Sequence, residues 1–302
     1  MREVKSKDMP MPIEKLILGL TTTLLSSAAF AAPPAWEITD EDSRIVLFPT
    51  IHVLPEGLDW ETNQLALEIE TADEVWLEIA DADSPEAQAE IQALMAAHGT
   101  SPDTPLSSRL SDEQLTTLKK QLAVMGIPLE SVDPLRPWMA ALMLTLTNFS
   151  QSGISPESGV EKVLNDYFGE RPVRGLESAA FQVSIFSSMS DEDQVDFLMS
   201  SLEEMDGVVD MFQAISESWA RGETDAIEQQ LISEMETDFP HLFEALFTNR
   251  NANWADIIET EMAGSGTDFI AVGAGHLIGD KSVQSMLVAR GYTIKRIDLT
   301  DK

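Results

Sequence analysis

Short apolar runs separated by polar turns characterise the chain from residue 36 to about residue 98. Residues 36–39 and 44–48 flank the turn Asp40-Glu41-Asp42-Ser43 and predict two short strands. Residues 74–78 predict a third strand, because valine, tryptophan, leucine and isoleucine are concentrated there and just after it. Helical spacing over residues 60–71 and a helix capped by Ser84 complete this part of the chain.

Helical spacing of apolar residues dominates the next part, from about residue 105 to residue 263. Ser111 and Gln114 form a capping box, and leucines follow it at helical intervals. Residues 153–158 are expected to form a polar turn, and a short strand is expected within residues 171–178. The rest of this block is predicted to be helical.

The chain ends with a strand, a helix and a strand, predicted over residues 267–275, 281–291 and 292–299. A lone β-α-β unit cannot bury its own strands, so the two ends of the chain must meet in one sheet. The predicted fold class is therefore α/β, with a mixed sheet built from N- and C-terminal strands. A large helical insertion, about residues 105–263, lies between them.

The N-terminus has the pattern of an export signal. Basic residues precede an apolar run at residues 16–29, which is short for a membrane span, and Ala29-Phe30-Ala31 matches a cleavage site. We expect residues 1–31 to be a signal peptide and residues 32–302 to form a single domain. The mature protein would be periplasmic or secreted, with no membrane span after cleavage. The alternative is a retained N-terminal anchor.

Composition excludes several classes of function. The chain lacks cysteine, so disulfides, thiol nucleophiles and cysteine–metal sites are absent. Its net charge of −33 is spread along the whole length. Such a surface repels nucleic acid, because the release of counterions that drives DNA binding requires basic residues. The partners that remain are a peptide or a small-molecule substrate, while the oligomeric state stays open.

Candidate chemistry lies where three predicted strands end. His52 and His276 each follow a strand, and Glu78 is near the end of another. Ligands of open α/β sheets bind beyond the carboxyl ends of the strands, so these side chains converge if the three strands are parallel neighbours. Two histidines and a glutamate form a common ligand set for a hydrolytic divalent metal, here Zn²⁺, Mn²⁺ or Co²⁺. The alternative is that each is an ordinary surface or core residue.

Longer motifs around these residues carry a resemblance to a known family. The second half of the pattern is Gly273-x-x-His276, and the first half is Pro49-Thr50-Ile51-His52, followed by Glu78 on the next strand. Further motifs occur in order along the chain at residues 136–138, 159–161, 173–182, 219–222 and 249–254. Together they resemble the TraB/GumN family, which is related to the Tiki proteases and carries two G-x-x-H motifs.

This resemblance implies an exported metal-dependent hydrolase, by analogy a peptidase. The metal ligands would be His52, Glu78 and His276, and the resemblance adds Arg250 and Glu177 as catalytic candidates beside Glu78. Arg250 suits a clamp for a carboxylate or oxyanion, because its guanidinium presents a fixed fork of donors. Glu177 is open to roles as a metal ligand, a base or a helix-capping partner.

One departure from the family pattern bears on activity. Proline replaces the first-motif glycine at position 49, and proline fixes φ and has no N–H group. If the loop needs the glycine conformation, His52 is misdirected. Two alternative functions therefore remain. One is a non-catalytic periplasmic protein that binds a peptide or a haem-like ligand, and the other is an envelope protein whose site has decayed.

Overall fold

The computed structural model describes residues 32–301 except Asp81 and Asp83. The expected signal peptide, residues 1–31, lies outside the described residues. The strands are β1 (Ala35–Thr39), β2 (Ser43–Thr50), β3 (Leu54–Pro55), β4 (Glu74–Ile79), β5 (Ile154–Ser155), β6 (Val173–Glu177), β7 (Gly266–Gly273) and β8 (Ile294–Ile297).

The longer helices are α1 (Asn63–Thr71), α2 (Pro85–Gly99), α3 (Asp112–Met125), α5 (Pro137–Gln151), α6 (Val160–Phe168), α7 (Ala179–Ser187), α8 (Asp191–Glu204), α9 (Val208–Ala220), α13 (Asn249–Met262) and α14 (Val283–Ala289). The shorter helical elements are η1 (Leu106–Ser108), α4 (Leu129–Val132), η2 (Pro156–Ser158), α10 (Asp225–Ile227), η3 (Glu228–Ile232), α11 (Ser233–Asp238), α12 (Pro240–Phe243), η4 (Glu244–Thr248) and η5 (Ala274–His276).

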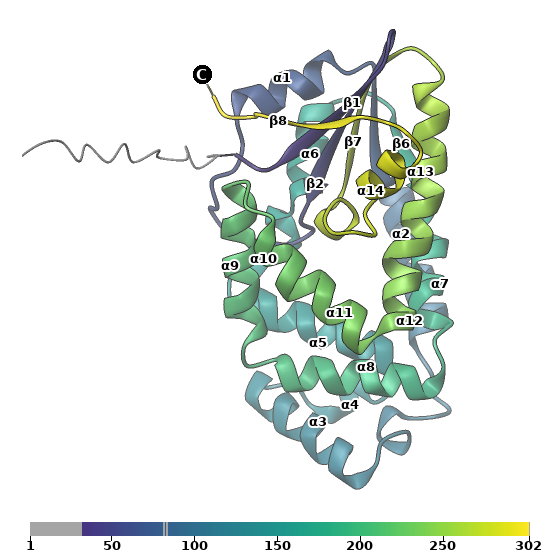
Figure 1. Cartoon of the computed structure of the whole chain (residues 1–302). Helices are drawn as coiled ribbons and strands as arrows, with labels where there is room; N and C mark the ends of the chain where they lie inside the picture. The colour runs from purple at the N-terminus through teal and green to yellow at the C-terminus, as the bar shows by residue number, and fades with distance from the viewer. Residues whose placement is uncertain (1–31, 81, 83, 302) are drawn as a thin grey trace, which may run out of the picture.

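Six strands form a mixed sheet in the order β6-β4-β7-β2-β1-β8. The neighbours β6, β4, β7 and β2 are parallel, whereas β1 runs antiparallel to both β2 and β8. The predicted α/β class is confirmed, and the strands that precede His52, Glu78 and His276 are parallel neighbours. Their carboxyl ends therefore meet at one edge of the sheet, which faces the helical block (Figure 1).

Helices cover both faces of the sheet. Successive side chains of a strand point to opposite faces, so each central strand contributes to a core on either side. On β2, Val46 and Phe48 pack in one buried cluster with residues of α1, α6 and α9. Ile45 and Leu47 pack in a second cluster with residues of α13 and α14. The sheet is therefore the middle layer of three.

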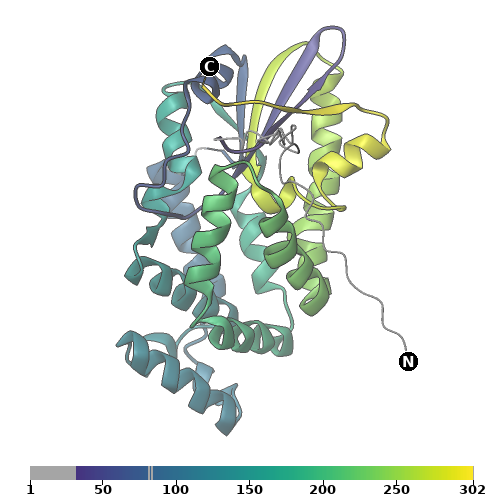
Figure 2. The same ribbon diagram turned by 60° about the vertical axis from the view of Figure 1, so that its left-hand side comes forward.

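The helical block has a core of its own. Leu118 of α3, Leu144 of α5 and Leu198 of α8 are fully buried together in a separate cluster. The capping box of α3 is present as predicted, with Ser111 and Gln114 each bonding the other's backbone N–H. The block lies against the carboxyl edge of the sheet in both views (Figures 1 and 2). It therefore closes one side of the candidate site.

The structure departs from the sequence prediction at the short strand β5, at two π-helical turns and in the sheet that β6 joins. The expected turn at residues 153–158 contains β5, which pairs with β3. The strand expected within residues 171–178 is β6, and it joins the main sheet beside β4 rather than staying within the helical block. Residues 224–235, expected to be one helix, include the π-helical turn η3 (Glu228–Ile232). A second π-helical turn, η4, ends just before α13.

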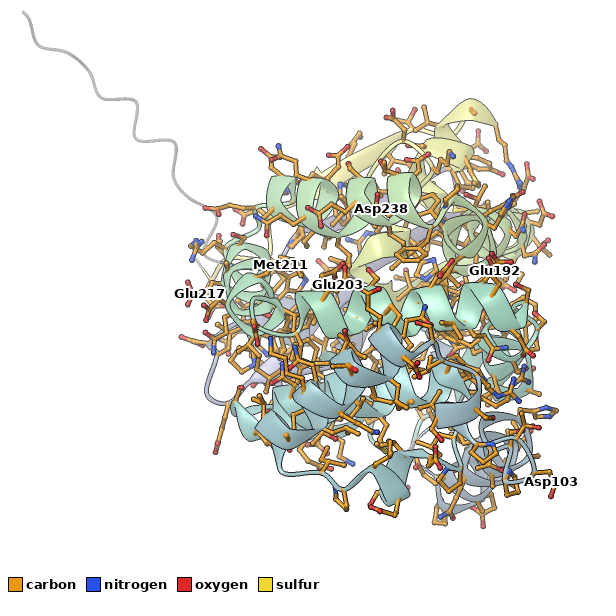
Figure 3. The ribbon with its side chains drawn as sticks, turned by 90° about the horizontal axis from the view of Figure 1, so that it is seen from below. Asp103, Glu192, Glu203, Met211, Glu217 and Asp238 are labelled. Carbon is orange, nitrogen blue, oxygen red and sulfur yellow. The ribbon has the colours of Figure 1, made fainter. Side chains whose placement is uncertain are left out.

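The surface matches the acidic composition. Figure 3 shows the underside of the molecule, where Asp103, Glu192, Glu203 and Asp238 lie at separate points of the helical block. Within the part of the chain that the structure describes, no helix combines the length and apolarity needed to cross a bilayer.

Candidate functional site

Three predicted residues surround one backbone position at the carboxyl edge of the sheet. A methyl group placed on Gly273 would lie 3.1 Å from Glu78 Oε1 and 3.6 Å from both His52 Nε2 and His276 Cδ2. His52 follows β2, Glu78 lies on β4 and His276 ends η5 directly after β7. Parallel pairing of these strands thus brings together residues that are more than 200 positions apart in the sequence.

The imidazole of His276 is held in one tautomer. Its Nδ1 lies 2.6 Å from Oδ1 of Asn251, whose Nδ2 donates to the carbonyl of Lys281 at 2.8 Å. Because that second bond fixes the amide orientation, Nδ1 must carry the proton and Nε2 keeps its lone pair. The ring packs against Trp254 and Phe247, and burial lowers the pKa of His276 to about 3. His276 is therefore neutral at neutral pH.

Arg250 uses all five of its N–H donors within the protein. Its Nε donates to both oxygens of Glu177 at 3.0 Å, and Nη2 donates to Glu177 and Glu78 at 2.6 Å. Nη1 donates to the carbonyl of Leu246 at 2.8 Å and to His276 Nε2 at 3.0 Å. The residue Arg250 is 5% exposed. Its positive charge neutralises the two buried carboxylates that it contacts. As the site stands, Arg250 has no free donor for a substrate.

Glu78 is a buried carboxylate with every oxygen engaged. Oε1 accepts from the backbone N–H of Gly273 at 2.8 Å, and Oε2 accepts from Arg250 and from Gln182 at 2.9 Å. Burial by itself would raise the pKa of Glu78, but the surrounding His276, Arg250 and His52 outweigh it and lower the pKa to about 2. Glu78 is therefore a permanent anion between the two histidines.

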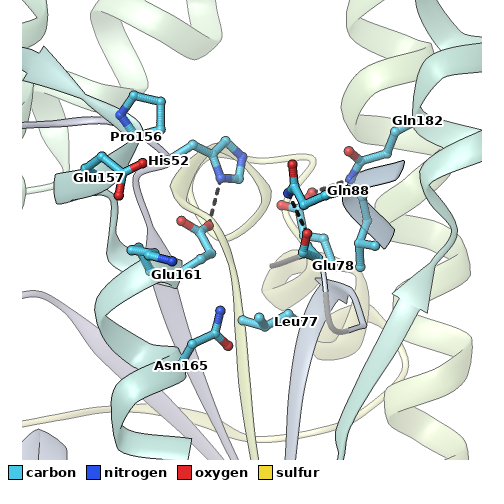
Figure 4. A pocket seen from close by; sticks show the side chains of 12 residues that line it. His52, Leu77, Glu78, Gln88, Pro156, Glu157, Glu161, Asn165 and Gln182 are labelled. Atoms are coloured by element: carbon cyan, nitrogen blue, oxygen red, sulfur yellow. Dashed lines mark hydrogen bonds and ion pairs between the residues drawn. The ribbon is translucent and has the colours of Figure 1, made fainter. Parts of the chain in front are cut away.

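His52 is oriented by a residue that sequence reasoning did not include in the site. Its Nδ1 lies 2.7 Å from Oε1 of Glu161 (Figure 4). The same oxygen also accepts a hydrogen bond from the hydroxyl of Thr50. The carboxylate of Glu161 raises the pKa of His52 above its ordinary value, although burial opposes it. With Nδ1 bonded to Glu161, Nε2 is the nitrogen that faces Gly273.

A glycine allows Glu161 to reach His52. Gly159 is the N-cap of α6, and a methyl group on it would collide with the backbone carbonyl of His52. The N–H of the next residue, Val160, donates to the carbonyl of Ile51 at 3.0 Å. The start of α6 is thereby fixed against the His52 loop, and Glu161 follows within the first turn of the helix.

Pro49 does not distort this loop. Strand β2 remains extended through Thr50, and Pro49 stays in parallel register with Val272 of β7. The ladder with β1 ends at the pair of Leu47 with Trp36, so Pro49 lies past it, and its carbonyl accepts from Trp219 Nε1 at 3.0 Å. An extended strand has negative φ, so this position does not need the left-handed conformation that only glycine adopts readily.

The residue types at the site fit a divalent metal, but their side chains are not positioned to coordinate one as they stand. Both imidazoles present Nε2 toward the site while Nδ1 is held by an oxygen, the arrangement typical of metal-ligating histidines. However, His276 Nε2 already accepts from Arg250, and it lies 3.8 Å from Glu78 Oε1. Among the described residues, no three histidine, aspartate or glutamate side chains are spaced to hold a metal as they stand. Metal binding would thus require Arg250 to release His276.

Two cavities of different character meet at these residues. The first, of about 560 Å³, is called the polar cavity because most of its lining residues are polar or charged, among them His52, Glu78, Glu161 and Gln182 (Figure 4). A mostly apolar cavity of about 440 Å³ shares His52, Glu78 and Gln182 with it and also reaches Arg250 and His276. The site therefore lies where a polar and an apolar compartment join.

The candidates from the sequence were His52, Glu78, His276, Arg250 and Glu177. The structure bonds the last four to one another through Arg250 and places His52 beside them at Gly273. Sequence reasoning missed the three residues that orient them: Glu161, Gln182 and Asn251. Each of the three lies inside a motif that carried the family resemblance, at residues 159–161, 173–182 and 249–254. That placement was the available signal, although only contacts give each residue its role.

The fold and the two-histidine edge define an α/β protein with a buried charged site, and comparison with known proteins identifies its family. The model of the TraB/PrgY/gumN family matches residues 34–296. The chain therefore belongs to the TraB/PrgY/gumN family.

Individual relatives share limited sequence identity with the chain. The chain is 27% identical over 186 residues to the uncharacterised protein YbaP of Escherichia coli (strain K12). The aligned region covers 60% of this chain and 67% of the relative. The YbaP protein of Shigella flexneri is similar to the same extent. No solved structure matches the chain significantly.

Proposed function

We propose that this protein is an exported metal-dependent hydrolase that cleaves peptides. The observation that carries the proposal is the meeting of His52 Nε2, Glu78 Oε1 and the His276 ring around Gly273. Two imidazoles with fixed Nδ1 partners and one carboxylate between them form a ligand set for Zn²⁺, Mn²⁺ or Co²⁺ that leaves positions open for water.

In this proposal, the residues of the site have three different roles. His52, Glu78 and His276 hold the metal, which on binding supplies a water of lowered pKa and polarises the carbonyl that is attacked. Glu161 and Asn251 aim the two imidazoles. Arg250 and Glu177 keep Glu78 ionised and in place, since each is bonded to the other and Arg250 is bonded to Glu78.

Glu177 is a weak candidate for general base in this arrangement. Its Oε1 accepts from Arg250 and from Gln182 Nε2 at 2.8 Å, and its Oε2 accepts from Arg250. A base must reach the proton that it removes, and these contacts direct the carboxylate into the protein. The oxygens of Glu78 are bonded as well, but Glu78 lines both cavities and so faces the substrate side, whereas Glu177 lines neither.

The proposed location outside the cytoplasm depends on the export signal at residues 1–31. The apolar run at 16–29 followed by Ala29-Phe30-Ala31 supports it. Fractionation of cells that express the full chain, with N-terminal sequencing of the exported product, tests this part of the proposal separately from activity.

Metal content is the decisive test of the activity. The purified protein is incubated with Zn²⁺, Mn²⁺ or Co²⁺, desalted and measured by mass spectrometry, and hydrolysis of a peptide library is followed with and without chelator. We expect about one metal per chain, lost in His276→Ala and retained in His241→Ala, whose histidine is exposed and outside the site. Equal metal content and activity in both variants would refute the proposal.

A second candidate, a protein that binds a peptide without cleaving it, is favoured by one observation. Arg250 Nη1 already satisfies the lone pair of His276 that a metal would need. The site would then be a stable charge network beside an apolar cavity. Calorimetric binding of peptides with no product formed, and no metal retained, would favour this function. A Soret band on haem titration would point to the haem-like ligand instead.

A further inference from the structure

The apolar cavity next to the site has a polar end and an apolar end. Its titratable lining residues are Glu78, Arg250 and His276, which are bonded to one another through Arg250, and His52, which lies beside them. The rest of its wall is mostly large aliphatic and aromatic side chains: Leu146, Ile185, Phe186, Phe212, Leu231 and Leu246. The chemistry of the cavity therefore changes from charged to apolar within its volume of about 440 Å³.

This apolar wall is assembled from separate helices rather than from one. Leu146 comes from α5, Ile185 and Phe186 from α7, and Phe212 from α9. Leu231 lies on η3 and Leu246 on η4, which are both π-helical turns. Such turns are rare and occur frequently at functional sites. Both π-helical turns described in this chain thus contribute to the same wall, which favours a ligand site over incidental packing.

The wall is not fully covered by the protein itself. Leu146 is 46% exposed although it is aliphatic, and Phe186, Phe212, Leu231 and Leu246 are only partly buried. An apolar ligand group that filled the cavity would remove this surface from water, which is favourable. A charged group at the apolar end would lose its hydration without gaining a partner, which is strongly unfavourable.

We infer that this cavity takes a large uncharged side chain, aliphatic or aromatic, of the peptide next to the bond that the site hydrolyses. The inference rests on the proposed function and adds the specificity of the same site. The polar cavity, which shares His52, Glu78 and Gln182 with this one, would take the hydrated part of the peptide. Leu146, at the open apolar wall, is the specificity-determining residue that a substitution reaches with least disturbance of the core.

The test has a cleavage arm and a binding arm. In the first arm, internally quenched peptides that differ only at one position, alanine, leucine, phenylalanine or aspartate, are compared by kcat/KM. In the second arm, the uncharged fluorophore N-phenyl-1-naphthylamine is titrated into the protein and displaced by the same peptides. The variants are Leu146→Asp and, as a matched control, Leu67→Asp on α1, because Leu67 is 48% exposed and is not part of the cavity wall.

We expect leucine and phenylalanine peptides to exceed the alanine peptide by roughly tenfold or more, since each methylene in an apolar pocket contributes strongly to discrimination. Leu146→Asp should remove most of that preference and weaken fluorophore binding, whereas Leu67→Asp should change neither. Equal rates across the series together with equal effects of the two variants would overturn the inference.

The binding arm separates this inference from the proposed function. If no peptide is cleaved but leucine and phenylalanine peptides displace the fluorophore in a Leu146-dependent manner, the hydrolase proposal fails and the cavity assignment stands. If cleavage occurs but ignores side-chain size, the hydrolase stands and the cavity assignment fails. If decanoate displaces the fluorophore and none of the peptides does, the cavity holds acyl chains and the side-chain assignment is overturned.

Discussion

His276 Nδ1 and Asn251 Oδ1 lie 2.6 Å apart, and both groups are almost fully buried. The two residues belong to different elements, η5 and α13, so the bond ties the loop after β7 to the helix that covers the sheet. Together with the bond from Arg250 Nη1 to Nε2, it leaves Nε2 as the accepting nitrogen of His276. The second histidine of the site is therefore prepared by a helix that contributes Arg250 one position earlier.

Replacement of Asn251 by leucine should release the His276 ring. Because Arg250 Nη1 still donates to Nε2, the proton should stay on Nδ1 but lose its acceptor. We expect Asn251→Leu to cost about 1–3 kcal/mol of stability and to lower metal affinity by roughly 10- to 100-fold. The lost hydrogen bond is read from the ¹⁵N chemical shift of Nδ1, which does not require metal or substrate. Asn249→Leu, an exposed residue on the same helix, is the control. An unchanged Nδ1 shift and unchanged stability in Asn251→Leu would contradict the assignment.

Gly159 should tolerate no side chain. We expect Gly159→Ala to push α6 away from the His52 carbonyl, break the contact between His52 and Glu161, and cost about 1–3 kcal/mol of stability. Urea unfolding and the ¹⁵N shifts of His52 measure the two effects. Gly207→Ala is the matched control, because Gly207 is also a helix N-cap and a methyl group there would meet its nearest neighbour at 4.0 Å. Similar losses in both variants would remove the special role of Gly159.

Pro49→Gly should leave the site intact. Because β2 is extended at this position and Pro49 lies past the pairing with β1, glycine there gains no conformation that the fold requires. We expect unchanged metal content and a loss of about 0.4–1 kcal/mol of stability, since glycine increases the entropy of the unfolded chain. A marked increase in metal affinity would show instead that proline impairs the His52 loop.

Because of Asp268, the fold should be more stable at mildly acidic pH than at neutral pH. Burial, followed by the charges of Glu74 and Glu261, raises the pKa of Asp268 to about 6 from an ordinary value of 3.8. The folded state therefore binds more protons than the unfolded state between these values, so this carboxylate destabilises the fold above pH 6 and ceases to do so as pH falls toward 4.

The corresponding variant is Asp268→Asn. At pH 8 it should raise the free energy of unfolding by less than about 1 kcal/mol, because the group is partly solvated. At pH 4 it should have little effect. Urea unfolding at both pH values measures the difference, and Glu113→Gln on the exposed start of α3 is the control. A destabilising effect of Asp268→Asn at pH 8 would contradict the sign.

Local pattern predicted most elements because each is stabilised by nearby residues. The capping box of Ser111 and Gln114 and the apolar run of residues 44–48 in β2 depend on neighbours within a few positions, and both the cap and the strand are present. The π-helical turn at Glu228–Ile232 was not predictable in this way, because its residues have ordinary helical spacing and only the surrounding contacts select the wider turn.

The sequence by itself indicated the two ends of the sheet, the helical insertion and the candidates His52, Glu78 and His276, to which the family resemblance added Arg250 and Glu177. Tertiary structure alone decided that Arg250 occupies the lone pair of His276, that Glu161 aims His52, and that an apolar cavity opens beside the charged network. The physical reason is that hydrogen-bond partners and cavities depend on distances between atoms from distant segments. Spacing along the chain records periodicity and residue type, but not which of many acidic residues lies against a given imidazole.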